Sequence, residues 1–228
     1  KNSKSRVTQL KAETQICIIN ILLEEAINKQ FDSLIAIVEE ATKFKEYDFL
    51  TLSKMVENML PIFSDNDKYN QLYEMITDKL SNRNCEIQRA EMYLKRAKIL
   101  LSNNKFYESI NILGKCLTFL YKNETDGKLV EAYINIGANF ESIGLHYVAK
   151  NYYIAAITMF IDIYLKDRYL DPFSLKVINR IIDLEISDGN VEEAIEWFSI
   201  KNILLSILYE SNENINFDEE NEYFIQRD

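Results

Sequence analysis

A chain of 228 residues that is 47% hydrophobic has enough apolar material for a sizeable core. It contains five glycines and two prolines, where average usage would give roughly 16 and 11, so a turn-rich β fold is excluded. The net charge of −10 and a pI near 4.8 exclude nucleic-acid binding through this segment.

Long helices joined by short polar loops are the structure that this composition predicts. Loop signals such as Asp65-Asn66, Asn103-Asn104 and Gly144 recur along the chain and divide it into segments of helical length. In chain order, the ten predicted helices are 8–28, 32–44, 47–63, 67–81, 85–102, 106–122, 128–143, 146–166, 173–188 and 191–211.

The three C-terminal hairpins share one residue pattern. A turn residue is followed five positions later by a small residue, then four positions later by a large one. These positions are Asn104, Ser109 and Leu113; Gly144, Ala149 and Tyr153; and Gly189, Ala194 and Phe198. Small side chains let two helices approach, and the large ones fill the space beside them.

This pattern resembles the tetratricopeptide repeat. The fourth hairpin carries the likeness at Tyr133, Ile136, Gly137, Phe140, Gly144, Tyr147, Ala149, Tyr153 and Ala156, and the third at Tyr93, Ala97, Leu100, Phe106, Leu113 and Cys116. The fifth departs from it, with Ile182 where a small residue is expected and Glu185 where an aromatic is. Toward the N-terminus only Phe31, Leu34, Val38 and Ala41 suggest a degenerate second helix.

The resemblance implies an all-α, right-handed superhelical stack of about five antiparallel helix hairpins. We expect one repeat domain over residues 1–211, with its best-defined repeats at 85–122, 128–166 and 173–211. An acidic tail follows at 212–228, which either docks on the last hairpin or stays unstructured. Because the first residue is Lys1 and not methionine, we expect a segment of a longer protein.

Catalytic and metal chemistry find no support in the residue pattern. Adjacent carboxylates such as Glu192-Glu193 point about 100° apart on a helix and would not clamp one reacting atom. His146 is the only histidine and no CxxC pair exists, so we predict no metal, no cofactor and no enzyme activity. Cys116 lies at a close helix contact and should be a buried, inert thiol.

The cellular setting follows from the cysteines and the hydropathy. Three unpaired cysteines indicate a reducing, cytoplasmic compartment. No signal peptide is visible, and the longest apolar stretch, 152–165, is too short to span a bilayer.

The resemblance implies a binding surface on the concave side, which the first helix of each hairpin lines. The predicted peptide-binding residues are Lys98, Ser102, Asn135, Glu141, Ser142, Lys176, Asn179 and Arg180. Four of them (Lys98, Asn135, Lys176 and Arg180) fall near the places where co-chaperone members of this family hold a peptide's terminal carboxylate. The match is incomplete, since Leu94 stands where that clamp has a lysine, and an ordinary mixed surface is the alternative.

The predicted function is therefore non-catalytic binding of a peptide or protein. The architecture also resembles the ligand-sensing domain of Gram-positive peptide-pheromone regulators, whose DNA-binding domain would lie outside this segment. The alternatives are a structural scaffold or subunit-assembly domain, and the regulatory arm of an enzyme whose catalytic domain is missing. A homodimer is compatible with the sequence, and a membrane partner is not expected.

Overall fold

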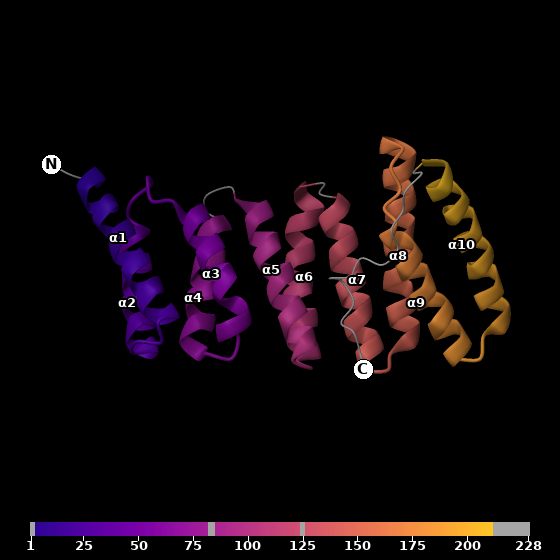
Figure 1. Ribbon diagram of the computed structural model, residues 1–228, viewed down its shortest axis with the longest axis horizontal. Coiled ribbons are helices and arrows are strands. Elements are labelled where there is room, and N and C mark those ends of the chain that lie inside the picture. Colours follow the sequence, from indigo (N-terminus) through magenta and orange to yellow (C-terminus); the bar gives the residue numbers. More distant parts are fainter. Residues whose placement is uncertain (1–2, 82–84, 124–125, 212–228) are drawn as a thin grey trace. The chain divides into compact units, whose positions relative to one another are not determined.

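The computed structural model describes residues 3–81, 85–123 and 126–211, and within them helices account for 85% of positions and no strand occurs. The all-α prediction is confirmed. The helices are α1 (Ser3–Leu22), α2 (Ile27–Ala41), α3 (Phe49–Phe63), α4 (Asp67–Ser81), α5 (Glu86–Ser102), α6 (Phe106–Asn123), α7 (Asp126–Ser142), α8 (His146–Asp167), α9 (Phe173–Ser187) and α10 (Val191–Ser211) (Figure 1). The predicted acidic tail at 212–228 lies outside the described residues.

The chain divides into two compact units, Lys1–Lys95 and Arg96–Asp228. In the first unit α1 packs on α2 and α3 on α4. Its core is aromatic: the Phe31 ring meets Phe63 and Tyr69 edge-on, with centroids 5.5 and 5.9 Å apart. Phe31, Leu34, Val38 and Ala41 are all fully buried, so the degenerate second helix is confirmed.

The bounds of the first two helices were predicted wrongly. Helix α2 spans Ile27–Ala41 instead of 32–44. Helix α1 begins five residues before the predicted start and ends at Leu22 instead of residue 28. The turn that ends it places Glu24 and Ala26 in the left-handed backbone region, at φ 61° and 48°. Neither residue type signals that conformation, which normally falls to glycine or asparagine.

The second unit holds the repeat. Asn104, Gly144 and Gly189 all have positive φ, between 59° and 83°. The backbone N–H of the residue after each of them donates to a carbonyl five positions earlier: Lys105 to Leu100 at 2.8 Å, Leu145 to Phe140 at 2.9 Å and Asn190 to Glu185 at 2.8 Å. Identical capping at three sites shows that the sequence repeat is a structural repeat.

The small residues behind these turns lie at the predicted helix contacts. Ser109 and Ala149 are fully buried and Ala194 is nearly so. Ser109, which stands where alanine is usual, donates its hydroxyl to the Ala97 carbonyl at 2.9 Å. The buried hydroxyl therefore joins α6 to α5 without leaving its donor unsatisfied.

The fifth hairpin differs from the fourth as its sequence indicated. Glu185 is buried and bonds to Lys150 Nζ at 2.7 Å, and Asn190 Nδ2 donates to the same carboxylate at 2.8 Å. Burial disfavours the charged form of Lys150, but its bonds to Glu185 and Asp188 outweigh that and raise its pKa. An ion pair between α8 and α9 thus replaces the aromatic residue of the family pattern.

Phe198 is the large residue of the pattern that does not pack as predicted. Its counterparts Leu113 and Tyr153 are fully buried, whereas Phe198 is 44% exposed. Ile182 occupies the place that Gly137 has in the fourth hairpin, and it is buried. In the fourth hairpin the absence of a side chain at Gly137 leaves room for the Tyr153 ring, and a branched side chain at position 182 removes the equivalent room in the fifth.

Candidate functional site

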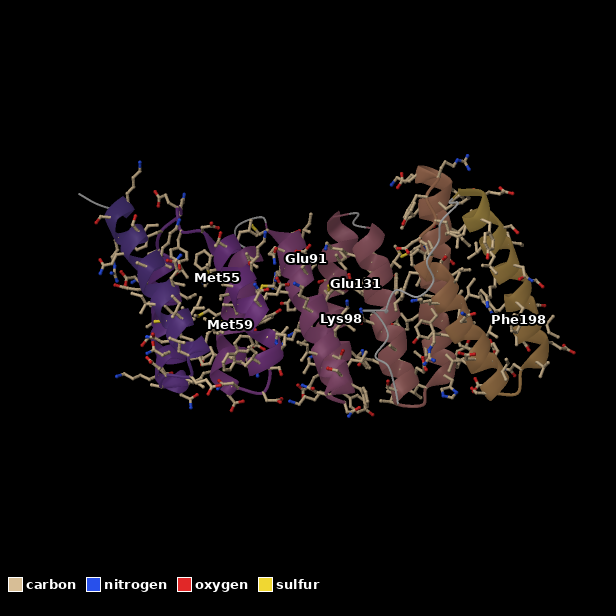
Figure 2. The ribbon with its side chains drawn as sticks, viewed as in Figure 1. Met55, Met59, Glu91, Lys98, Glu131 and Phe198 are labelled. Atoms are coloured by element: carbon tan, nitrogen blue, oxygen red, sulfur yellow. The ribbon has the colours of Figure 1, made fainter. Side chains whose placement is uncertain are left out.

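Lys98, near the end of α5, is the first of the predicted site residues along the chain. Its Nζ lies 3.0 Å from Glu131 Oε1 on α7, and the two side chains are 26% and 20% exposed (Figure 2). Partial shielding from water strengthens such a pair relative to a fully exposed one. Lys98 therefore already holds a carboxylate of its own chain.

Asn135 lies one helical turn after Glu131 and is buried. Its Nδ2 donates to the Glu131 carbonyl at 2.8 Å. One turn further, Asn139 Nδ2 donates to Ser109 Oγ at 2.9 Å and to the Asn135 carbonyl at 2.7 Å. Within the described residues, Oδ1 of both amides is buried and accepts no hydrogen bond. An unsatisfied buried acceptor costs about 1–3 kcal/mol, so this pair is exceptional.

Glu141 and Arg180 come together across α7 and α9. Arg180 Nη2 donates to Glu141 Oε1, and the Tyr153 hydroxyl donates to Glu141 Oε2 at 2.8 Å. Burial of the phenol, followed by the nearby Glu141 carboxylate, raises the pKa of Tyr153 far above its ordinary value. The Arg180 side chain remains 38% exposed, so its outer edge is accessible.

The other predicted residues lie at the helix ends and along α9. Ser102 and Ser142 each turn their hydroxyl back onto their own helix, toward the carbonyls of Ile99 and Ala138 at 2.8 Å. Lys176 and Asn179 are half-buried on α9.

The predicted set therefore contains two local groups. Lys98 and Asn135 are joined through Glu131, and Glu141 is joined to Arg180. Sequence reasoning missed Asn139 and the Tyr153 hydroxyl. The four-residue spacing of Asn135 and Asn139 on one helix was the available signal for the former.

A cavity of about 480 Å³ opens beside the first group. Its walls come from the start of α7, the end of α8 and the start of α9. The lining residues are Gly127, Lys128, Val130, Glu131, Ile134, Phe160, Ile163, Asp167, Tyr169, Asp171 and Phe173. The walls are apolar and aromatic, and three carboxylates and one lysine contribute their charges.

No reactive group stands out in the described part of the chain. Burial raises the pKa of Cys116 to about 12, and it also raises the pKa of Cys17. No cluster of three or more potential metal ligands occurs among the described residues. His146 Nδ1 lies 2.6 Å from Asp188 Oδ1, a contact that ties the start of α8 to the end of α9. No described helix is both long and apolar enough to cross a membrane.

Comparison with known proteins supports the fold. No protein-family model and no curated protein matches the sequence. Among solved structures, BtubC from P. vanneervenii matches over 100% of both chains, with 12% identity and a TM-score of 0.59. A putative kinesin light chain from Podospora anserina with TPR-like repeats matches over 91% of this chain and 99% of its own, with 12% identity and a TM-score of 0.52.

A third likeness is to a Rap protein solved in complex with competence and sporulation factor. It covers 86% of this chain and 54% of the Rap chain, with 14% identity and a TM-score of 0.54. At these identities the comparisons define a fold. This chain has the architecture of the tetratricopeptide-like helical-repeat proteins, as the sequence predicted.

Proposed function

We propose that the chain binds a peptide, or an extended segment of another protein, along the inner surface of the second unit, formed by the part of α5 that belongs to this unit (Arg96–Ser102) together with α7 and α9. The observation that carries this proposal is the 480 Å³ cavity, which adjoins the Lys98–Glu131 pair. Concave sites with apolar walls and a few convergent polar groups are the usual form of ligand sites.

The chemistry of the cavity favours a particular side chain. Val130, Ile134 and Ile163 supply apolar walls, and Asp167 and Asp171 add two carboxylates to the lining. A lysine or arginine side chain combines an apolar stem with a cationic tip and suits both features. We therefore propose that a basic residue of the ligand occupies this cavity.

The rest of the predicted site would hold the ligand's backbone and its carboxylate end. Asn135 and Asn139 carry unused acceptors, which a small displacement of α7 side chains would turn toward backbone N–H groups of a peptide. Arg180 and Lys176 on α9 would bind the carboxylate, with Arg180 exchanging Glu141 for the ligand. Charge-assisted hydrogen bonds of this kind are the strong ones.

We further propose that such binding is regulatory and belongs to a ligand-sensing domain of a cytoplasmic bacterial regulator. The supporting observation is that a Rap protein of the same fold is complexed with competence and sporulation factor. A sensing role requires that the domain bind its ligand without catalysing a reaction. The Cys116 thiol is consistent with this, because burial keeps it protonated and therefore unreactive.

The test uses peptides selected from a random displayed library against the 228-residue chain. Arg180→Ala should weaken binding of a selected peptide by about 1.5–3 kcal/mol, the worth of a hydrogen bond to a charged group. Ile163→Trp should fill the cavity and abolish binding. Both variants should fold, because Arg180 and Ile163 are only partly buried and Glu141 keeps the Tyr153 hydroxyl.

The two matched control variants change one exposed residue on α8 and one at its end. Thr158→Trp adds the same ring to an exposed position of α8 that does not line the cavity, and Arg168→Ala removes an exposed cation at the end of α8. Both controls should bind like the unmodified chain. Selected peptides that bind all four variants equally would refute the proposed surface.

A further inference from the structure

Helix α10 carries an apolar stripe on a face that is turned away from its own core. Val191, Ile195 and Phe198 are 60%, 60% and 44% exposed, and their spacing of four and three residues aligns them along the helix. Tyr209, which is 66% exposed, continues the row three turns further on. These four residues form the α10 stripe. Another face of α10 is buried, as Leu204 shows, so the helix is apolar on two sides and its own unit covers one of them.

The α10 stripe has no cover among the described residues of its own unit. Helix α10 packs on α9, and the stripe lies outside that contact (Figure 1). Single exposed apolar side chains are ordinary on protein surfaces, whereas an aligned row marks a surface that another element can bury. A spacing of four and three residues is the one that a second helix recognises, because its side chains fit between such a row.

A row of carboxylates flanks the α10 stripe. Glu192, Glu196 and Glu210 are exposed and share one side of the helix, about 100° round from the apolar residues. None of the three forms an ion pair among the described residues. Lys201 is the only basic residue of α10, and its Nζ lies over the Phe198 ring, 5.8 Å from the centroid. The charge beside the stripe is therefore predominantly negative and not neutralised by the chain's described residues.

The stability of the helix does not account for this row. Glu192 lies in the first turn, where the helix dipole favours a carboxylate. Glu196 follows it by four residues, and like charges at that spacing repel each other. Glu210 lies in the last turn, where the dipole disfavours a negative charge. A cationic surface docked along this side would relieve both unfavourable effects.

We propose that the α10 stripe and its row of carboxylates form a docking surface for a basic amphipathic helix of another protein. The apolar face of that helix covers Val191, Ile195 and Phe198, and lysine or arginine side chains beside that face pair with Glu192 and Glu196. The same carboxylates disfavour nucleic acid and anionic membranes as partners. The surface shares no residue with the 480 Å³ cavity, so it is independent of the proposed peptide binding.

The experiment measures the binding of two model peptides to the 228-residue chain by fluorescence anisotropy. Both peptides form the same amphipathic helix with leucines on one face. One has lysines beside that face, and the other has glutamates at the same positions. The unmodified chain should bind the lysine peptide about tenfold more tightly, because two attractive charge pairs become repulsive in the glutamate peptide. Raising the salt concentration should narrow this difference.

Two double variants test the two features of the surface separately. Glu192→Lys/Glu196→Lys should reverse the preference, so that the glutamate peptide binds more tightly than the lysine peptide. Ile195→Ser/Phe198→Ser should abolish the binding of both peptides, because the apolar contact is lost. Both variants should keep their helical circular dichroism, since all four side chains are exposed.

Three further variants are controls and should bind the lysine peptide like the unmodified chain. Tyr107→Ser and Glu108→Lys change an aromatic residue and a carboxylate at exposed positions of α6. Ile163→Trp fills the cavity that is proposed to take a basic side chain. If Ile163→Trp alone removed binding, the lysine peptide would occupy the cavity, and the α10 surface would be refuted while the cavity would gain support.

Three other outcomes would overturn the proposal. Equal binding of the two peptides by the unmodified chain would show an apolar surface without charge preference. Binding that persists in Ile195→Ser/Phe198→Ser would place the peptide elsewhere on the molecule. If the lysine peptide did not bind at all, the stripe would be covered in the free chain, either by residues 212–228 or by a second copy. Sedimentation velocity separates these two, because only a second copy gives a dimer that Ile195→Ser/Phe198→Ser dissociates.

Discussion

The ring of Tyr153 on α8 lies against the backbone of Gly137 on α7. A Cβ atom added to Gly137 would stand 2.6 Å from Tyr153 Cε1 and 2.8 Å from Cδ1, closer than real Cβ contacts. The ring cannot easily withdraw, because Tyr153 is fully buried and its hydroxyl is bonded to Glu141. Glycine at position 137 is thus a packing requirement, since it lets α7 and α8 approach closely.

Gly137→Ala should therefore destabilise the fold, although alanine is the better helix former. We expect a loss of about 1–3 kcal/mol, the usual effect of overpacking. Gly114→Ala on α6 is the matched control, because a Cβ there meets no atom within 4 Å. That control should gain about 0.5–1 kcal/mol from helix propensity alone. Urea unfolding curves of both variants measure the contrast, and a stabilised Gly137→Ala would contradict the contact.

Ala149 tests the same interface from the α8 side. Ala149 and Ala156 are both fully buried, as the repeat predicted. Ala149→Leu should overpack the contact and destabilise by about 1–3 kcal/mol. Asn151→Leu on the exposed face of α8 should change stability by no more than about 0.5 kcal/mol. If the two variants had equal melting temperatures, Ala149 would not lie on the face of α8 that packs against a neighbouring helix.

The ion pair between Lys150 and Glu185 makes a prediction about the fifth hairpin. Both side chains are 9% exposed, so Lys150→Met would leave a buried carboxylate without its cation. A loss of about 3–5 kcal/mol is expected for a buried pair broken on one side. Lys150→Met/Glu185→Leu should recover most of this loss, because buried pairs can be replaced by apolar residues of similar volume. Chemical denaturation measures the free energy of unfolding of both variants. A double variant as unstable as the single one would contradict a stabilising interaction between Lys150 and Glu185.

The thiols should differ in reactivity. With the pKa of Cys116 raised to about 12 by burial, this thiol stays protonated at pH 8 and should react with an alkylating reagent only after unfolding. Cys17 is buried as well, whereas Cys85 is only partly buried. Mass spectrometry after brief alkylation of the native chain should find label on Cys85 first. Rapid labelling of Cys116 would show that α6 opens locally.

Much of the second unit was predictable because its signals are local. Asn104, Gly144 and Gly189 mark their turns through backbone conformation, and small residues five positions later mark the helix contacts. The turn between α1 and α2 escaped prediction, because its left-handed positions hold Glu24 and Ala26. We attribute this backbone conformation to the packing of the two helices, which cannot be predicted from the types of the turn residues.

Helix periodicity and turn chemistry act over a few residues, so the class of fold and the hairpins could be predicted from the sequence. Which charged groups of the predicted site are paired with one another is visible only in the folded structure. Lys98 meets Glu131, and Arg180 meets Glu141 together with Tyr153. These partners lie on different helices and are more than thirty residues apart in sequence for each ion pair. Which charges neutralise one another therefore depends on the helix packing, and a sequence projection shows them as free.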